Sequence, residues 1–134
     1  MAAIAAYATP CQYSIGPGES LQVWNAQAVP AGNGAGTLSA SMQVAPVRVP
    51  GENGTSFSVD GFFSAAPGVF EIDVQVAAVD LDGQYQTCAG GQINSVDAVM
   101  QTFHFVGNAE NARFVRLLMR TLTNAVNVTA AIKR

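Results

Sequence analysis

The chain has 134 residues, of which 49% are hydrophobic and 11% charged, and its formal net charge at pH 7 is −3. A large hydrophobic share with few charges excludes a disordered chain, and the length favours one domain around one core. No apolar run reaches the about 20 residues of a membrane-spanning helix, and a pI of about 4.8 disfavours nucleic acid as a partner.

Residues 1–19 show no regular hydrophobic period, yet they contain large apolar and aromatic side chains. Four of them are candidate partner contacts: Ile4, Tyr7, Tyr13 and Ile15. Such a segment is either a lid over one end of the domain or an arm that reaches a neighbouring subunit. We therefore divide the chain into an extended N-terminal arm or lid, residues 1–19, and a single domain, residues 20–134. No Lys or Arg precedes Arg48, so no secretory signal is expected.

From residue 20 onward, apolar and polar residues alternate with a period of two, which is typical of half-buried β-strands. The first such runs cover residues 21–24, 38–44, 47–49 and 57–63. Between them, the glycine-rich residues 31–36 predict a loop. No Lys-Ser or Lys-Thr pair ends this segment, so it is not expected to bind phosphate.

Two aromatic residues fall on the polar side of these runs. Trp24 falls opposite Leu21 and Val23 in its run, and Phe62 falls opposite the apolar line of Val59 and Phe63. Either both side chains are exposed, as anchors for a protein partner or a stacking platform for sugar rings, or they are buried under a loop or the second sheet. We include Trp24 and Phe62 among the candidate partner contacts.

The clearest alternation lies in residues 70–76, which predict a half-buried antiparallel strand. Its apolar face carries Phe70, Ile72, Val74 and Val76, and its polar face carries Glu71, Asp73 and Gln75. The Asp-Leu-Asp-Gly sequence at 80–83 predicts a turn, and residues 84–88 return as the partner strand of a hairpin. We expect the polar face to be solvated, and we therefore do not assign its two carboxylates to glycoside cleavage.

The last third of the chain continues the same pattern. Residues 99–105 predict a strand with His104 on its polar side. Residues 113–122 fit either a strand or one face of a helix, and we favour a strand because residues 121–124 lead directly into the alternating run 126–132. These two runs are expected to form a terminal hairpin. About eight strands result, so the predicted fold is all-β, an antiparallel β-sandwich with the eight strands of a jelly roll.

Charge is distributed unevenly along the chain. Residues 1–112 contain all nine acidic residues and one base, whereas residues 113–134 contain five bases and no acid. The basic end can therefore lie against acidic groups either within the fold or on a partner. Arg116 and Arg120 share one strand face, and we include them as candidate contacts for a neighbour's carboxylates.

Motifs for catalysis or metal binding are weak. The single histidine, His104, lacks the sequence context of a hydrolase nucleophile, and Asp80 and Asp82 lack the later carboxylates of a calcium loop. The two cysteines, Cys11 and Cys88, have no metal-binding or redox spacing, and we expect buried thiols rather than a disulfide. We therefore predict no enzyme activity, no cofactor and no metal.

Several segments resemble a family of virion proteins. They are the TSFSVDGFF run at 55–63, the Pro-Gly turn at 67–68, the long run 69–80, and the closing segments 112–116 and 126–130. Together they resemble the small jelly-roll decoration, or cement, proteins of tailed bacteriophage capsids, over residues 20–134.

The resemblance implies a structural protein without catalysis or cofactor, assembled in the host cytoplasm onto the capsid surface of a virion. It implies a homo-oligomer, a dimer or trimer, that bridges major capsid subunits, with no nucleic-acid or membrane partner. The alternative is a β-sandwich module that binds carbohydrate or a receptor, which would need Trp24, Phe62 or Tyr85 on an open face.

Overall fold

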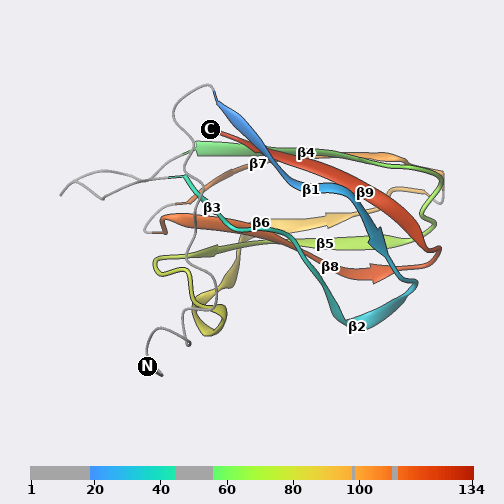
Figure 1. Ribbon diagram of the computed structural model, residues 1–134, viewed down its shortest axis with the longest axis horizontal. Coiled ribbons are helices and arrows are strands. Elements are labelled where there is room, and N and C mark those ends of the chain that lie inside the picture. Colours follow the sequence, from blue (N-terminus) through green and yellow to red (C-terminus); the bar gives the residue numbers. More distant parts are fainter. Residues whose placement is uncertain (1–18, 45–55, 98, 110–111) are drawn as a thin grey trace.

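The computed structural model describes residues 19–44, 56–97, 99–109 and 112–134, and most of these residues lie in β-strands (Figure 1). The elements in chain order are β1 (Ser20–Val29), β2 (Gly32–Leu38), β3 (Met42–Gln43), β4 (Ser56–Phe63), β5 (Phe70–Ala77), the 3-10 turn η1 (Asp82–Gln84), β6 (Gln86–Asn94), β7 (Thr102–Asn108), β8 (Phe114–Leu122) and β9 (Val126–Lys133). No helix within these ranges is long and apolar enough to cross a membrane.

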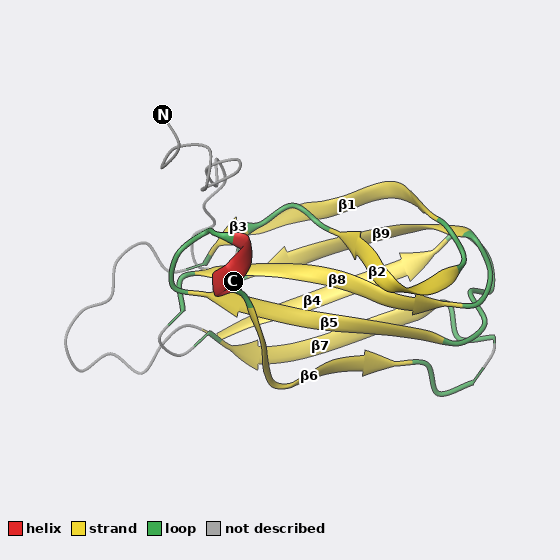
Figure 2. Cartoon of the chain, turned by 90° about the horizontal axis from the view of Figure 1, so that it is seen from below, coloured by secondary structure: helices red, strands yellow, loops and turns green. Residues whose placement is uncertain are grey.

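The strands form two antiparallel sheets that face each other (Figure 2). The first sheet has the order β1-β9-β4-β7, and the second has the order β2-β8-β5-β6, with the short β3 also paired to β8. If β3 is set aside, the eight long strands are ordered 1-8-3-6 in one sheet and 2-7-4-5 in the other. This is the jelly-roll order, so the predicted all-β sandwich is confirmed.

The core lies between the sheets and is made of the apolar face of each strand. Its most deeply buried side chains are Trp24, Phe70, Met42, Ile72, Leu117, Met119, Ile132, Val44, Val59, Val74, Val115 and Val128. At its centre the rings of Phe63, Phe70 and Phe103 pack in tilted pairs, with centroids 4.8 to 6.1 Å apart. Such aromatic contacts add to the stability gained from burial alone.

The sequence pattern located most strands correctly. Residues 113–122 form a strand, β8, as we favoured, and β5 and β6 form the expected hairpin around the turn at η1. The run at 57–63 is β4, with Phe57, Val59 and Phe63 buried. The predicted run at 47–49 lies outside the described residues.

Two predictions were wrong, one about strand pairing and one about a loop. The run at 113–122 does not form a hairpin with 126–132, because β8 belongs to the second sheet and β9 to the first. The chain crosses between sheets at residues 123–125, as the jelly-roll order requires. The glycine-rich segment is not a loop: Gly32–Leu38 is β2, and its first two and last two residues pair with β8 on either side of an irregularity. Strand pairing uses backbone groups, which small residues supply as well as large ones.

Trp24 owes its position to a bulge in β1. Gln22 opposes Ala131 and Trp24 opposes Ala130, so Val23 is an extra residue that shifts the strand by one position. A shift of one residue exchanges the two faces of a strand. Trp24 therefore points into the core and is only 2% exposed, which settles its two alternatives in favour of burial.

Gly61 on β4 gives a test of core packing. The ring of Phe103 occupies the space that a β-carbon at residue 61 would need. We expect Gly61→Ala to lower the free energy of unfolding by about 1–3 kcal/mol, because the ring must move within a filled core. The measurement is chemical denaturation. Gly83→Ala is the matched control, because nothing lies within 4 Å of its added carbon. Equal stability of both variants would contradict the packing described.

Candidate functional site

Arg116 on β8 joins a cluster of polar side chains on the second sheet. It stands opposite Gln75 on β5, and its Nε donates to Gln75 Oε1 at 2.8 Å. Its Nη1 donates to Asp82 Oδ1 at 2.8 Å, and its guanidinium lies 3.9 Å from the centroid of the Tyr85 ring. The Arg116 side chain is only 11% exposed. Its charge is therefore neutralised within the chain.

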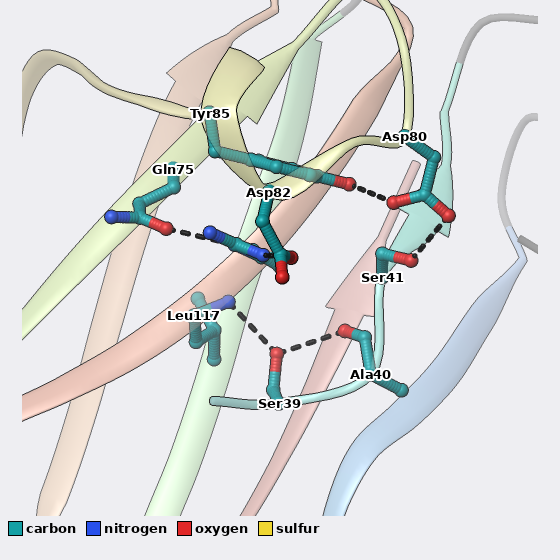
Figure 3. Close-up of polar contacts among 9 residues, drawn as sticks. Ser39, Ala40, Ser41, Gln75, Asp80, Asp82, Tyr85 and Leu117 are labelled. Carbon is teal, nitrogen blue, oxygen red and sulfur yellow. Dashed lines mark hydrogen bonds and ion pairs between the residues drawn. The ribbon is translucent and has the colours of Figure 1, made fainter. Parts of the chain in front are cut away.

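Tyr85 extends the cluster to the link between β2 and β3 (Figure 3). Its hydroxyl donates to Asp80 Oδ1 at 2.5 Å, and Ser41 Oγ donates to Asp80 Oδ2 at 3.0 Å. Burial of Tyr85, together with its hydrogen bond to the Asp80 carboxylate, raises the pKa of its hydroxyl. The cluster thus fastens the loop between β5 and β6 to the opposite edge of the same sheet.

Arg120 forms a second ion pair on the same sheet. It is the extra residue of a bulge, because Glu71 opposes Thr121 while Ile72 opposes Met119. Its Nε and Nη2 both donate to Asp73 Oδ2, the former at 2.7 Å, and its Nε lies 4.0 Å from Glu71 Oε1. The hydrogen bond to Asp73 raises the pKa of Arg120.

Asp73 and Gln75 on the polar face of β5 are therefore not solvated, contrary to the expectation from alternation, whereas Glu71 stays partly exposed. Asp73 is 0% exposed and Gln75 is 9% exposed, because the two arginines of β8 lie across them. Asp73 Oδ1 is buried without a hydrogen-bond partner among the described residues. A carboxylate held in this way stabilises an arginine and is poorly placed to exchange protons with a substrate.

His104 lies on the outer face of the first sheet, on the polar side of β7 as predicted. Its Nδ1 lies 2.5 Å from Asp60 Oδ1 on β4, and the two side chains are 60% and 61% exposed. The pair stands directly across the strand ladder, Asp60 opposite His104. An exposed pair of this kind orients the imidazole but contributes little to stability.

Strands β4, β6 and β8 end at the same end of the sandwich (Figure 2). The loops at this end contain few charged residues. We define the charge-poor end as the described loop residues 64–69, 95–97, 99–101 and 123–125. Within them the exposed large apolar residues are Val69 at 57%, Val96 at 85% and Val99 at 72%. Their one charged residue is Asp97, whose Oδ1 accepts a hydrogen bond from Val99 N at 2.9 Å.

Hydrogen bonds between these loops hold the valines in place. Thr123 N donates to Val69 O at 3.0 Å, and Ser95 N donates to Phe70 O at 3.0 Å. Phe70 N in turn donates to Ser95 Oγ at 3.1 Å. The strand predicted at 99–105 begins only at Thr102, so Val99 lies in the preceding loop and not on the apolar face of a strand. Val69 and Val96 were not chosen as contacts, because they too lie in loops, where alternation does not report exposure. The sequence signal that could have revealed them is the presence of bulky apolar residues next to the turn residues Pro-Gly and Asp.

The candidate contacts chosen from the sequence separate into three groups. Ile4, Tyr7, Tyr13 and Ile15 lie outside the described residues, as does Cys11. Phe62 is 53% exposed on the outer face of the first sheet, so its outward orientation is confirmed. Trp24 is buried, and Arg116 and Arg120 bind carboxylates of their own chain.

No cation site is found among the described residues, which contain no group of three or more His, Cys, Asp or Glu side chains placed to hold a metal. Asp80 and Asp82, the pair that resembles the start of a calcium loop, instead accept hydrogen bonds from Tyr85 and Arg116. Cys88 is partly buried on β6.

No protein-family model matches the chain, and no curated protein matches it. Three similar solved structures cover most of it. The SPBc2 prophage-derived protein YomS has a TM-score of 0.48 and 10% identity, over 88% of this chain and 96% of that one. PirA has a TM-score of 0.41 and 14% identity, over 90% and 95%. The pre-peptidase C-terminal domain of collagenase from Bacillus anthracis has a TM-score of 0.41 and 10% identity, over 90% and 93%.

The two members of the ion pair between Arg116 and Asp82 are expected to contribute unequally to stability, and mutation of each can measure the difference. The Arg116 side chain is 11% exposed and makes several contacts, whereas the Asp82 side chain is 75% exposed. We expect Arg116→Met to cost about 1–3 kcal/mol of unfolding free energy, because Gln75 loses its donor and Tyr85 its covering group. Asp82→Asn should cost less than about 1 kcal/mol, because the carboxylate is solvated. Denaturation curves of both variants are the measurement, and equal losses would contradict this assignment.

Asp73 and Arg120 should behave as a coupled pair. We expect Arg120→Met to cost about 2–3 kcal/mol, because it leaves a buried carboxylate unpaired, although the 43% exposure of Arg120 moderates the loss. The double variant Asp73→Leu with Arg120→Met should recover most of that stability. A double-mutant cycle by chemical denaturation measures this, and strictly additive losses would show that the pair is not coupled.

Proposed function

We propose that this chain is a non-enzymatic structural protein of a virion, which decorates the capsid and stabilises it by bridging neighbouring major capsid subunits. The observation that carries the proposal is the charge-poor end, where Val69, Val96 and Val99 are exposed. Their loops are joined by hydrogen bonds, so these exposed apolar residues lie at one end of the molecule. Groups of exposed apolar residues mark interaction surfaces, and the centre of a protein interface is depleted of charge.

The hydrogen bonds at this end favour a binding role for the valines. Val99 is fixed by Asp97, and Val69 by Thr123, so the apolar side chains are presented on ordered loops. A partner that covers ordered loops loses less conformational entropy than one that must first order them. The valines are therefore presented on a preorganised surface, which favours the binding of a partner such as a capsid subunit.

A second contact region at the opposite end of the sandwich would allow bridging. Glu19, the first described residue, lies there, and its carbonyl accepts a hydrogen bond from Arg134 N. β1 has 10 residues, so the point where residues 1–18 join it lies about 30 Å from the charge-poor end. The candidate contacts Ile4, Tyr7, Tyr13 and Ile15 would reach one capsid subunit while the valines bind another. Two weak contacts joined in this way bind with increased avidity.

The alternative of a carbohydrate-binding module has lost support. Two of the three aromatic residues that it needs are engaged elsewhere, because Trp24 is buried in the core and Arg116 stacks on the ring of Tyr85. Phe62 remains exposed. One exposed ring on a sheet face is less than the aromatic platform on which sugars stack.

The test is co-sedimentation of the chain with large particles from a lysate of the cells that produce it. We expect the wild-type chain to sediment with a megadalton particle. The double variant Val96→Asp with Val99→Asp should lose attachment by about tenfold or more, because it places charges at the centre of the contact.

Leu38→Asp serves as the matched control, because Leu38 is 46% exposed on β2, outside the charge-poor end. It should sediment as the wild type does, and circular dichroism should show that all variants are folded. A wild-type chain that stays at the top of the gradient would refute the proposal. Undiminished attachment of the double variant would refute the role of the valines.

A further inference from the structure

The outer edges of the two sheets differ in regularity. Three edge strands, β1, β2 and β6, have shifted registers against their partners, and in β6 residues 88–91 bulge out opposite Val74. Bulges of this kind prevent another strand from pairing with an exposed edge. β7 is different, because its 7 residues pair with β4 in unbroken register.

The backbone groups that face outward from β7 can be identified. Phe63 N donates to Gln101 O at 2.8 Å, so the odd-numbered residues of β7 form the hydrogen-bonded pairs with β4. Ser64 N donates to Asn127 O at 2.9 Å, so the even-numbered residues of β4 form hydrogen bonds with β9. This agrees with the assignment, because it leaves the odd-numbered residues of β4 to pair with β7. The N–H and C=O groups of Thr102, His104 and Val106 therefore point away from β4, towards the edge with which no other described strand pairs.

The side chains on this edge do not oppose pairing. Thr102, His104 and Val106 are exposed, Val106 by 65%. β7 contains no Pro and no Lys, the residues that protect edges most often, and its His104 is already held by Asp60. The segment Thr-Phe-His-Phe-Val is also rich in residues that favour strands.

We propose that β7 pairs with β7 of a second copy of this chain, antiparallel about a two-fold axis, so that the two first sheets join into one continuous sheet. A two-fold axis makes such an edge self-complementary. When His104 faces His104 of the second copy, Thr102 faces Val106 in both directions, and every outward N–H and C=O of the three residues finds a partner. The strand has no Asp, Glu, Lys or Arg, so two copies approach without fixed-charge repulsion.

The irregular edge of β6 explains why only the first sheet would continue across the dimer at the β7 edge. The bulge of β6 lies in the second sheet, on the side of the sandwich where β7 forms the edge of the first. It interrupts the regular ladder that a continuing second sheet would need. The dimer would therefore be joined through one sheet, and this proposal does not depend on attachment to a capsid.

Amide hydrogen exchange of the wild-type chain at several protein concentrations tests the pairing directly. In the monomer, the amides of Phe103, Phe105 and Gly107 should be protected by β4, whereas those of Thr102, His104 and Val106 should exchange rapidly. In the dimer, exchange of this second set should slow by about tenfold or more as concentration rises. Sedimentation velocity on the same samples should show the mass doubling in parallel.

Val106→Lys should weaken the dimer, because a lysine on the edge opposes a second strand. Val69→Lys is the matched control, because Val69 has a similar exposure of 57% but lies in the charge-poor end. A wild-type chain that stays monomeric at every concentration would overturn the proposal. A dimer that is unaffected by Val106→Lys would overturn it as well. Protection of the amides of Thr102, His104 and Val106 in a monomer would also overturn it, because another segment of the chain would then cover the edge.

Discussion

Burial of one face of every long strand against the opposite sheet is the constraint from which the rest of this structure follows. At the centre, Phe63 of the first sheet packs on Phe70 of the second, with centroids 4.8 Å apart, and Phe103 closes the group. Because side chains alternate along a strand, each added residue exchanges the two faces. The bulges in β1 and β8 thus decide which chemical groups reach the core and which reach the surface.

The outer face of the second sheet shows how this constraint shapes the electrostatics. β5 and β8 are central strands, so polar groups on their outer faces are crowded by neighbours on both sides. Asp73 is buried even though it points away from the core, and Arg120 reaches it from a bulge. The basic C-terminal part of the chain is thereby matched to acidic residues that precede it in the sequence. The effect of such buried ion pairs on which strands can lie side by side is larger than their contribution to stability.

Much of the fold could be predicted from the sequence, because alternation reports burial directly. The runs that became β4, β5, β8 and β9 were located in this way, and they suggested a sandwich of about eight strands. Sheet membership could not be predicted, because β8 and β9 adjoin in the chain and lie in different sheets. β2 was missed because its first residues pair through the backbone, and side-chain patterns carry no record of that. The candidate site was predicted less well: Phe62 was placed correctly, but the inward turn of Trp24 depends on one extra residue in β1.

The pairing of β1 with β9 has a consequence for the synthesis of the protein. Among the described strands, β1 is synthesised first, and its partner in the first sheet, β9, is synthesised last. The pairing of β1 cannot form until β9 has been synthesised, so β1 must wait for its partner while the strands between them emerge. An interval of this kind exposes an apolar strand to other nascent chains. The bulges that shape β1 in the finished sheet would also make it a poor template for wrong pairing during that interval.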